Sequence, residues 1–349
     1  MKLIPVDAPG HEQVVRIEDS ESGLSGIIAV HSTQLGPAAG GLRMRPYDSF
    51  EAALEDALRL SRGMTFKNAA AGLPLGGGKA VIIGDPARDK SPEVLRAFGR
   101  AVEAMQGQYW TAEDMGMTPR DMAEIGTQTD YVAGLADGAF ASGDPSPITA
   151  RGIFNAIHTT ARHRFGSSDL TGRRVAIQGL GHVGLHLCRF LHGAGARLVV
   201  TDVSDAPMRQ AVEMFGARAV ATEAIYGAEA DIFAPCAIGA ILNETTIPQL
   251  QVSAVAGGAN NQLATAHDGQ RLHERGILYA PDFVANGGGI INVATEILRI
   301  GNREIWVGEK LEALDDTMDR ILTRARQLSV SPNDVAEAIV TERLQKAAA

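Results

Sequence analysis

The sequence predicts an α/β protein of two domains. Its 349 residues are long for a single domain and suit two. From residue 173 onward, short β-type runs alternate with helical runs at a spacing that is typical of a parallel sheet. Before them, residues 137–147 (DGAFASGDPSP) form a Gly/Ser/Pro/Asp stretch that is typical of a hinge. We therefore expect a first domain over residues 1–140 and a second over 141–329, with a C-terminal helix at about 330–349 packed against the first.

The first half is expected to begin with strands and to continue with a capped helix. Residues 13–46 contain two β-type runs that are separated by a Ser/Gly turn. Residues 49–64 have apolar positions at helical spacing, and Ser49 can cap that helix with the acidic Glu51 close behind. A glycine loop then leads into a strand over residues 80–83. Helices should follow over residues 93–105 and from about Pro119.

In the second half the expected strands and helices alternate. Strands are expected over residues 173–178 and 196–202, each followed by a helix, over 182–195 and 206–216. The remaining elements are short strands within 231–235, 252–258 and 277–281, a helix from about Gly289, and two more helices toward the C-terminus.

Composition and charge exclude several classes of function. The net charge of −9 argues against a nucleic-acid-binding protein, which needs a basic face. No apolar stretch is fit for a signal peptide or a membrane span, so we expect a cytoplasmic protein without a membrane partner. Cys188 and Cys236 lie in apolar surroundings and are expected to be buried free thiols. The histidines show no metal-ligand spacing, so no metal is predicted.

A glycine motif, GLGHVG, lies between an expected strand and an expected helix. Gly179 permits the turn, Gly181 lets the backbone approach a pyrophosphate, and Gly184 lets the helix pack against the strand. The start of the helix then offers free N–H groups to the phosphates. In this context the motif predicts a Rossmann-type, doubly wound dinucleotide-binding domain. The alternative is an ordinary glycine turn.

Asp202 ends the next expected strand, 18 residues beyond Gly184. A carboxylate at this place can accept hydrogen bonds from the ribose hydroxyls and repels a 2′-phosphate, which favours NAD over NADP. The alternative is a surface aspartate, and Arg209 keeps NADP open as a second choice.

The first half contains two lysines and a carboxylate beside glycine-rich backbone. Lys67 follows the expected helix, Lys79 follows three glycines, and Asp114 lies in the segment TAED. One lysine can hold a carboxylate, a partly buried lysine beside another cation can have its pKa lowered, and an aspartate can move a proton. The alternative is solvated surface residues on turns. Because Ala80 follows Lys79, the segment GGGK is not a nucleoside-triphosphate loop.

Longer segments resemble the glutamate/leucine/phenylalanine/valine dehydrogenase family, and within it most of all the leucine dehydrogenases. The resemblance runs in order from about residue 12 to 345. Its segments are STQLGPAAGGLR, RGMTFKNAAAGLPLGGGKAVIIGDP, YWTAEDMG, GDPSPITARGIF, GLGHVG, FAPCAIGA, AGGANNQL and YAPDFVANGGGIINVA. Together they are highly specific, although each segment alone is not.

The resemblance implies roles for particular residues. Lys67, with backbone at Gly40 and Gly41, would bind the substrate carboxylate; Lys79 would be the catalytic lysine, and Asp114 the general acid/base. Asn260 would orient the substrate and the nicotinamide. Further cofactor contacts would come from Thr149, Ala237 and Ile238.

The implied activity is NAD-dependent oxidative deamination of a branched-chain L-amino acid to its 2-oxo acid and ammonia. Hydride leaves Cα to give an iminium, water activated by Lys79 adds to it, and Asp114 relays protons as ammonia departs. Closure of two domains over the substrate would suit this chemistry by excluding water. Family likeness also implies a homo-oligomer, an octamer or a dimer.

Substrate preference is expected to depend on a pocket wall formed by Ala39, Ala112, Ile290 and Val293. Ala112 and the aliphatic pair match the leucine type, whereas Ala39 resembles the phenylalanine enzymes and predicts a roomier pocket. A phenylalanine or other aromatic amino-acid dehydrogenase is therefore the second interpretation. A non-catalytic NAD-binding regulator is a distant third, because it would be expected to lack one of Lys67, Lys79 and Asp114.

Overall fold

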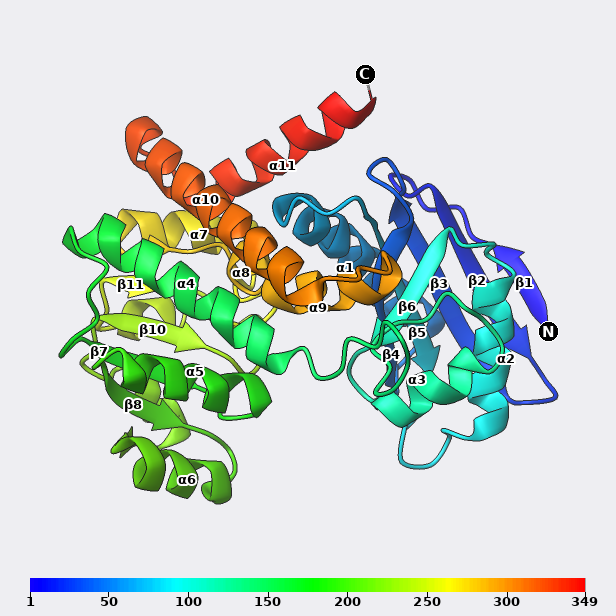
Figure 1. Ribbon diagram of the computed structural model, residues 1–349, viewed down its shortest axis with the longest axis horizontal. Coiled ribbons are helices and arrows are strands. Elements are labelled where there is room, and N and C mark those ends of the chain that lie inside the picture. The colour runs from blue at the N-terminus through cyan, green and yellow to red at the C-terminus, as the bar shows by residue number, and fades with distance from the viewer. Residues whose placement is uncertain (349) are drawn as a thin grey trace. The chain divides into compact units, whose positions relative to one another are not determined.

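The computed structural model describes residues 1–348, which form two compact units (Figure 1). The first unit contains Met1–Pro145, Ile290–Val307 and the residues from Glu342 onward. The second unit contains Ser146–Gly289 and Gly308–Thr341. Both units are α/β, which confirms the predicted fold class. The domain limits drawn from the sequence, with a boundary at 140/141, stay a prediction.

The first unit is built on a six-stranded mixed sheet with the order β1-β2-β3-β5-β4-β6. Strands β1, β2, β3 and β5 pair antiparallel, whereas β4 pairs parallel with both β5 and β6. The strands are β1 (Lys2–Pro5), β2 (Gln13–Asp19), β3 (Leu24–Ser32), β4 (Ala38–Arg45), β5 (Gly76–Ile83) and β6 (Tyr109–Glu113). The sequence predicted two β-type runs within residues 13–46, and the structure has three strands there.

The glycines before Lys79 lie inside β5, whereas the sequence predicted a loop at this place. Each of these glycines lies where a neighbouring segment approaches the strand so closely that a side chain would not fit. A Cβ on Gly76 would lie 1.9 Å from the Ser32 carbonyl oxygen, and one on Gly77 would lie 2.1 Å from the Thr65 nitrogen. The glycine run therefore reflects close packing around a buried strand.

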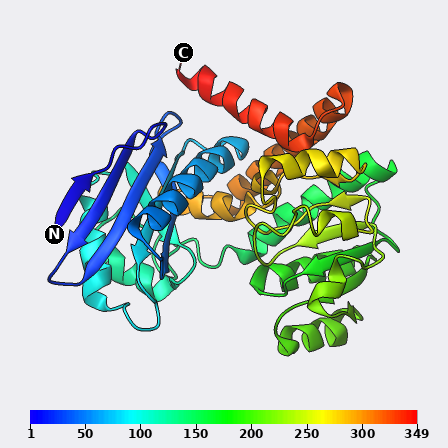
Figure 2. The same cartoon turned by 180° about the vertical axis from the view of Figure 1, so that it is seen from behind.

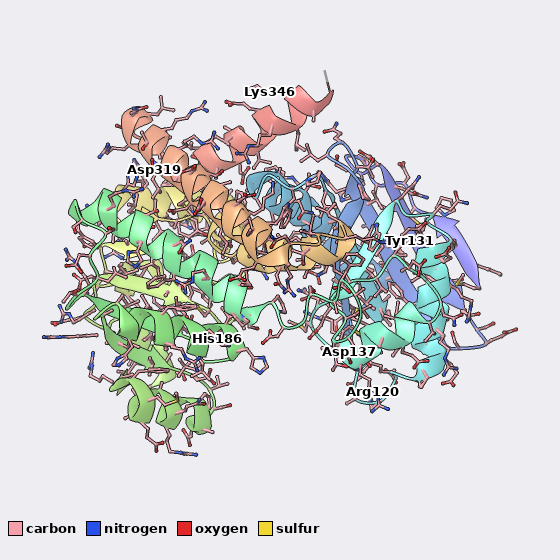
Figure 3. All side chains as sticks on the ribbon, in the orientation of Figure 1. Arg120, Tyr131, Asp137, His186, Asp319 and Lys346 are labelled. Carbon is pink, nitrogen blue, oxygen red and sulfur yellow. The ribbon has the colours of Figure 1, made fainter. Side chains whose placement is uncertain are left out.

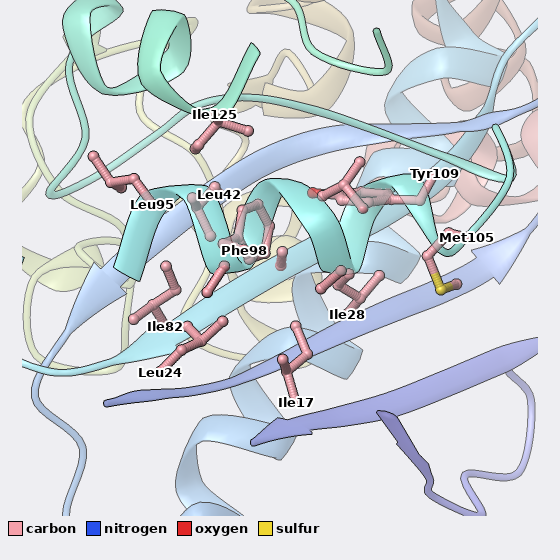
Figure 4. Packing of buried hydrophobic residues seen from close by; sticks show 14 of the residues in the cluster. Ile17, Leu24, Ile28, Leu42, Ile82, Leu95, Phe98, Met105, Tyr109 and Ile125 are labelled. Atoms are coloured by element: carbon pink, nitrogen blue, oxygen red, sulfur yellow. The ribbon is translucent and has the colours of Figure 1, made fainter. Parts of the chain in front are cut away.

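Helices cover both faces of this sheet (Figures 1 and 2). Helix α1 (Phe50–Ala70) packs on one face, with Ala53 and Ala57 against Val81 of β5. Helix α2 (Pro92–Glu103) packs on the other face, where Phe98 lies among Leu42 and Ile82 (Figure 4). Helix α3 (Pro119–Gly126) joins the α2 side.

Helix α1 begins as the sequence predicted, since the Ser49 side chain accepts the Ala52 N–H. It continues to Ala70 instead of ending near residue 64, because Asn68 to Ala70 are buried and keep the helix packed. As a result Lys67 lies in the last turn of α1, not on a turn after it.

The second unit is built on a six-stranded parallel sheet with the order β12-β11-β10-β7-β8-β9. The chain runs from β7 outward to β9 and then returns to β10 on the other side of β7. This reversal makes the unit doubly wound, as predicted, with a switch point between β7 and β10. The strands are β7 (Arg174–Gln178), β8 (Arg197–Thr201), β9 (Arg218–Ala219), β10 (Ile232–Pro235), β11 (Ala254–Val255) and β12 (Leu278–Tyr279).

Helix α4 (Ser146–Phe165) was not predicted, because the notable pattern near it is the Gly/Pro-rich stretch that precedes it. It is fastened to α10 (Arg303–Leu328) by Asp319, labelled in Figure 3, which accepts from Arg162 at 2.7 Å and contacts His163 at 2.8 Å. The other helices are α5 (His182–Gly193), α6 (Asp205–Phe215), α7 (Ala266–Glu274), α8 (Asp282–Ala285), α9 (Gly288–Ile297), α11 (Pro332–Ala348) and the short 3₁₀ segments Thr222–Ile225 and Ile247–Gln249.

Candidate functional site

Strand alternation brings several of the predicted chemical residues onto one face of the first sheet. Successive side chains of a strand point to opposite faces. Leu42 of β4 pairs with Ala80 of β5, and both belong to the core under α2. Their odd-numbered neighbours therefore face α1, whose last turn carries Lys67. These neighbours are Ala39, Gly41 and Arg43 of β4 and Lys79 of β5. Ala112 of β6 lies on the same face because it pairs with Gly41.

The centre of this face is an ion pair between Lys79 and Asp114. Lys79 is only 5% exposed, and its Nζ donates to Oδ2 of Asp114, which directly follows β6. The sequence had placed Lys79 on a turn beside another cation; it lies within β5, and its direct partner is a carboxylate. Strand order explains the difference, because β4 alone separates β5 from β6.

The charge state of Asp114 depends on its neighbours. Burial raises the pKa of this carboxyl, but the positive charges of Lys79 and Arg43 lower it by more than burial raises it. The pKa therefore lies at about 2. Asp114 is therefore ionised at neutral pH. A partly buried carboxylate of this kind can accept a proton from a bound ammonium group.

Gly40 and Gly41 bring β4 close to these groups. A Cβ on Gly41 would lie 2.8 Å from Cβ of Asp114, and one on Gly40 would lie 1.8 Å from the Gly78 carbonyl oxygen. The Gly40 carbonyl oxygen accepts the Tyr109 hydroxyl at 2.8 Å. Only glycine fits at either position without moving the backbone.

Arg43 belongs to this face and was missed by the sequence reasoning. Its Nε donates to Oδ2 of Asp114 at 3.3 Å, and its Nη1 donates to Oδ2 of Asp56 at 2.9 Å. The signal was present, since Arg43 lies two residues beyond Gly41 and so shares its strand face. Without the pairing of β4 with β6, nothing in the sequence brings Arg43 to Asp114.

The residues expected to form a pocket wall belong to the same compact unit. Ala39 is fully buried and lies level with Gly77 and Trp110 of the neighbouring strands, and Ala112 is buried. Ile290 and Val293 lie on α9, in the part of the chain that joins the first unit. The structure thus places all four in one unit, although the sequence separates the two pairs by almost 180 positions.

Helix α9 is fastened by buried polar contacts. The Glu296 carboxylate accepts backbone N–H groups of Gly134 at 2.7 Å, Ser142 at 3.2 Å and Leu135 at 3.3 Å. Asn292 donates to the Ser142 carbonyl oxygen at 3.1 Å. These bonds hold the segment that follows β6 against the helix that carries Ile290 and Val293.

The glycine motif of the second unit has the geometry of a dinucleotide site. Gly179 has φ of +95°, which disfavours any side chain, and a Cβ on Gly184 would lie 2.1 Å from the Gly179 carbonyl oxygen. A Cβ on Gly181 would meet no atom within 4 Å, so its missing side chain leaves open space at the start of α5. Helix α5 begins at His182 without a side-chain cap. These features fit a bound pyrophosphate.

Asp202 directly follows β8 and helps to shape the glycine loop. Its Oδ2 accepts the Leu180 N–H at 2.6 Å, and its Oδ1 accepts the Ser204 N–H at 2.9 Å. Each carboxylate oxygen can accept more than one hydrogen bond. The side chain can therefore hold the loop and still accept from ribose hydroxyls.

The other residues expected at the cofactor lie in the same unit. Ala237 and Ile238 follow β10, and a Cβ on Gly179 would lie 2.7 Å from that of Ala237, so the loops after β7 and β10 meet at the switch point. Ile238 is 68% exposed. Asn260 follows β11 and accepts from Asn286 at 2.9 Å, and Thr149 lies in the first turn of α4.

Other chemistry is sparse in the described residues. Cys188 and Cys236 are free thiols; Cys188 is buried as expected, whereas Cys236 is only partly buried. Burial raises the pKa of the Cys188 thiol to about 12 and that of the Cys236 thiol to about 11. Within residues 1–348, no group of three His, Cys, Asp or Glu side chains could hold a metal ion. No helix in that range is both long and apolar enough to cross a bilayer.

Comparison with protein families gives two matches. Residues 11–131 match the model described as "Glu/Leu/Phe/Val dehydrogenase, dimerisation domain". Residues 201–348 match the model described as "Glutamate/Leucine/Phenylalanine/Valine dehydrogenase". The two matches together span more than half of the chain.

The relatives are named for amino-acid substrates with different side chains. Leucine dehydrogenase of Geobacillus stearothermophilus is 51% identical over 335 residues, 96% of this chain and 91% of that protein. Phenylalanine dehydrogenase of Caldalkalibacillus thermarum is 45% identical, over 97% and 92% of the two chains. The crystal structure of L-tryptophan dehydrogenase from Nostoc punctiforme superposes with a TM-score of 0.84 at 43% identity and covers 97% of both chains.

Proposed function

The chain belongs to the glutamate/leucine/phenylalanine/valine dehydrogenase family, and on that premise we propose that it reversibly deaminates a branched-chain L-amino acid (leucine, valine or isoleucine) to its 2-oxo acid and ammonia, with NAD. Membership makes it an amino-acid dehydrogenase. NAD is the cofactor that the family and the nucleotide-binding unit support. The observation that carries the proposal is the ion pair between the buried Lys79 and the partly buried Asp114, beside Gly41.

Substrate binding is assigned to the first unit. Lys67, on the α1 side of the sheet, would bind the α-carboxylate, with backbone groups of Gly40 and Gly41 beside it. This leaves the amino group and Cα for the pair formed by Lys79 and Asp114. Asn260 of the second unit would help to orient the substrate and the nicotinamide.

Cofactor binding is assigned to the second unit. Gly179, Gly181 and Gly184 would admit the pyrophosphate at the start of α5, and Asp202 would accept from the ribose hydroxyls. Thr149, Ala237 and Ile238 complete the proposed set. When bound, NAD supplies the acceptor for the hydride that leaves Cα.

Proton movement is assigned to Asp114 and Lys79. The ionised Asp114 carboxylate can take a proton from the substrate ammonium group, which frees the nitrogen lone pair needed to form the iminium. Lys79 would then hold and activate the water that adds to the iminium carbon. Asp114 returns its proton to the departing nitrogen, and the products are the 2-oxo acid and ammonia.

Preference for aliphatic side chains is supported by Ile290 and Val293 and by the 51% identity to a leucine dehydrogenase. Ala39 favours a second candidate, an aromatic amino-acid dehydrogenase, since an alanine at this position resembles the phenylalanine enzymes. Relatives named for phenylalanine and tryptophan, each 45% identical, keep that candidate open. A homo-oligomer remains part of the proposal, because the family match over residues 11–131 is named a dimerisation domain.

The test is NADH or NADPH formation at 340 nm and alkaline pH with L-leucine, L-valine, L-isoleucine, L-phenylalanine, L-tryptophan and L-glutamate, each with NAD and with NADP. We expect the branched-chain substrates with NAD to give the highest kcat/KM. A Lys79→Met variant purified in parallel is the control for host dehydrogenases and should lose the activity. Dominant turnover of an aromatic substrate would replace the specificity proposal, and no turnover on the whole panel would contradict the enzymatic one.

A further inference from the structure

A chain of alternating charges runs from α1 across β4 to the pair formed by Lys79 and Asp114. Asp56 of α1 accepts from Arg43 of β4 at 2.9 Å, and Arg43 in turn donates to Asp114 at 3.3 Å. The side chains of Asp56 and Arg43 are 13% and 14% exposed. Charged groups that are this well buried are costly unless they are paired, so the arrangement depends on all its members.

Asp56 is itself held from two sides. The Tyr47 hydroxyl donates to its Oδ2 at 2.8 Å, and Arg59 donates to its Oδ1 at 3.0 Å. Asp56 therefore keeps a fixed place on α1. Arg43 donates from one nitrogen to Asp56 and from another to Asp114. It therefore connects the fixed carboxylate of Asp56 to the proposed catalytic carboxylate of Asp114.

Lys79 and Arg43 both bind the same oxygen of Asp114, Oδ2. Rotation of this carboxylate about its Cβ–Cγ bond would break both contacts, so Oδ1 also keeps one orientation. Lys79 has a second task in the reaction, which is to serve the water that adds to the substrate. While it does so, Arg43 is the cation that stays on Asp114.

We propose that Arg43 is a positioning residue for Asp114: its guanidinium, anchored by Asp56, holds the carboxylate in place and compensates its charge while Lys79 acts on the substrate. This inference rests on the proposed role of Asp114 as the general acid/base.

The pH dependence follows from the groups that face Asp114. These are Lys79 from β5, Arg43 from β4 and, behind it, Asp56 from α1, with Tyr109 of β6 on the opposite face. Arg43 is one of two cations that lower the pKa of Asp114 against the effect of burial. Without it that pKa rises, and the protonated, inactive form of Asp114 persists to higher pH.

The experiment compares Arg43→Gln, Arg43→Lys and Asp56→Asn with the wild-type enzyme. In Arg43→Gln we expect kcat to fall by about 10- to 100-fold with little change in the amino-acid KM, because misplacing a catalytic group by about 1 Å costs that much. The acidic limb of kcat/KM should move to higher pH. Arg43→Lys should restore the acidic limb of the pH profile but only part of kcat, since lysine keeps the positive charge and loses the planar guanidinium that donates to two carboxylates. Asp56→Asn should have a smaller effect of the same kind.

Arg45→Gln is the matched control, because it makes the same change two residues along the same strand at an exposed side chain. It should leave kcat and the pH profile unchanged. Crystal structures of wild type and Arg43→Gln add a readout that does not depend on turnover, and the Asp114 carboxylate should rotate in the variant.

A lower melting temperature in Arg43→Gln with kcat, pH profile and carboxylate orientation all unchanged would overturn the inference, since Arg43 would then be only structural. Absence of wild-type activity on every amino acid contradicts the proposed function instead. In that case the orientation of Asp114 in the two crystal structures still decides whether Arg43 holds it.

Discussion

At the scale of single residues, the fully buried Ala39 is the position where the proposed specificity is most open. It lies between Gly77 and Trp110 in the sheet, on the same face as Lys79. A larger side chain there must occupy space near the reacting groups or displace its neighbours. The volume available to the substrate side chain should therefore respond to this residue.

Ala39→Leu should shift the preference toward leucine. Added methylenes in such a pocket change discrimination by about 1–3 kcal/mol, so the ratio of kcat/KM for phenylalanine to that for leucine should fall about tenfold or more. Ala39→Val is the intermediate step and guards against overpacking, which costs about 1–3 kcal/mol of stability. Both ratios and melting temperatures should be measured. An unchanged ratio in folded variants would mean that Ala39 does not line the pocket.

At the scale of elements, the three glycines of the motif at the start of helix α5 are not equivalent. Gly179 is needed for its backbone angle and Gly184 for the approach of the helix to the turn, whereas Gly181 has no protein atom near its missing side chain. Its φ of −67° also suits any residue. Structure and ligand binding therefore make separate demands on one short motif.

Substitution of these glycines by alanine should separate the two demands. Gly184→Ala should lower stability by about 1–3 kcal/mol, because the added carbon overlaps a backbone oxygen. Gly181→Ala should keep the melting temperature but weaken NADH binding, measured by calorimetry. The control is Gly193→Ala at the end of the same helix, where a Cβ meets no atom within 4 Å. If Gly181→Ala binds NADH like the wild type, the cofactor does not approach the loop at that residue.

At the scale of the whole molecule, stability should depend on pH through groups that folding places in unusual surroundings. Burial lowers the pKa of His31 to about 4, and the charges of His11 and Arg62 lower it as well. His31 lies against His11, with ring centroids 5.0 Å apart, and bonds to the Thr65 hydroxyl at 2.8 Å. The folded chain thus keeps this imidazole neutral at pH values where the unfolded chain would protonate it.

We expect the stability to fall as the pH is lowered from about 6.5, the pKa of an ordinary histidine, to about 4, the pKa of folded His31. Over that pH range His31 binds a proton in the unfolded chain but not in the folded chain. A second loss should follow below 3.8, because Asp114 in the folded chain remains ionised down to about 2. Urea unfolding from pH 7 to pH 4 should show a smaller pH slope in His31→Asn than in the wild type. An equal slope would show that His31 is not the group responsible.

Much of this protein was determined by local sequence. Three features depend only on neighbouring residues and could be recognised without the structure. They are the cap at Ser49, the alternation of strands and helices, and the motif from Gly179 to Gly184. Lys79 and Asp114 were also chosen in this way, because lysines and a carboxylate beside glycine-rich backbone suit the proposed chemistry; their roles stay a prediction.

Tertiary structure alone decided which of these groups meet. Arg43 and Asp114 are 71 positions apart and come together only because β4 pairs with β6 and β5. The same holds for the burial of Ala39 and for the extension of α1 to Ala70, both of which depend on packing against distant parts of the chain. Local patterns record what a segment can form, whereas contacts between remote segments depend on sheet order and register, which no short stretch of sequence contains.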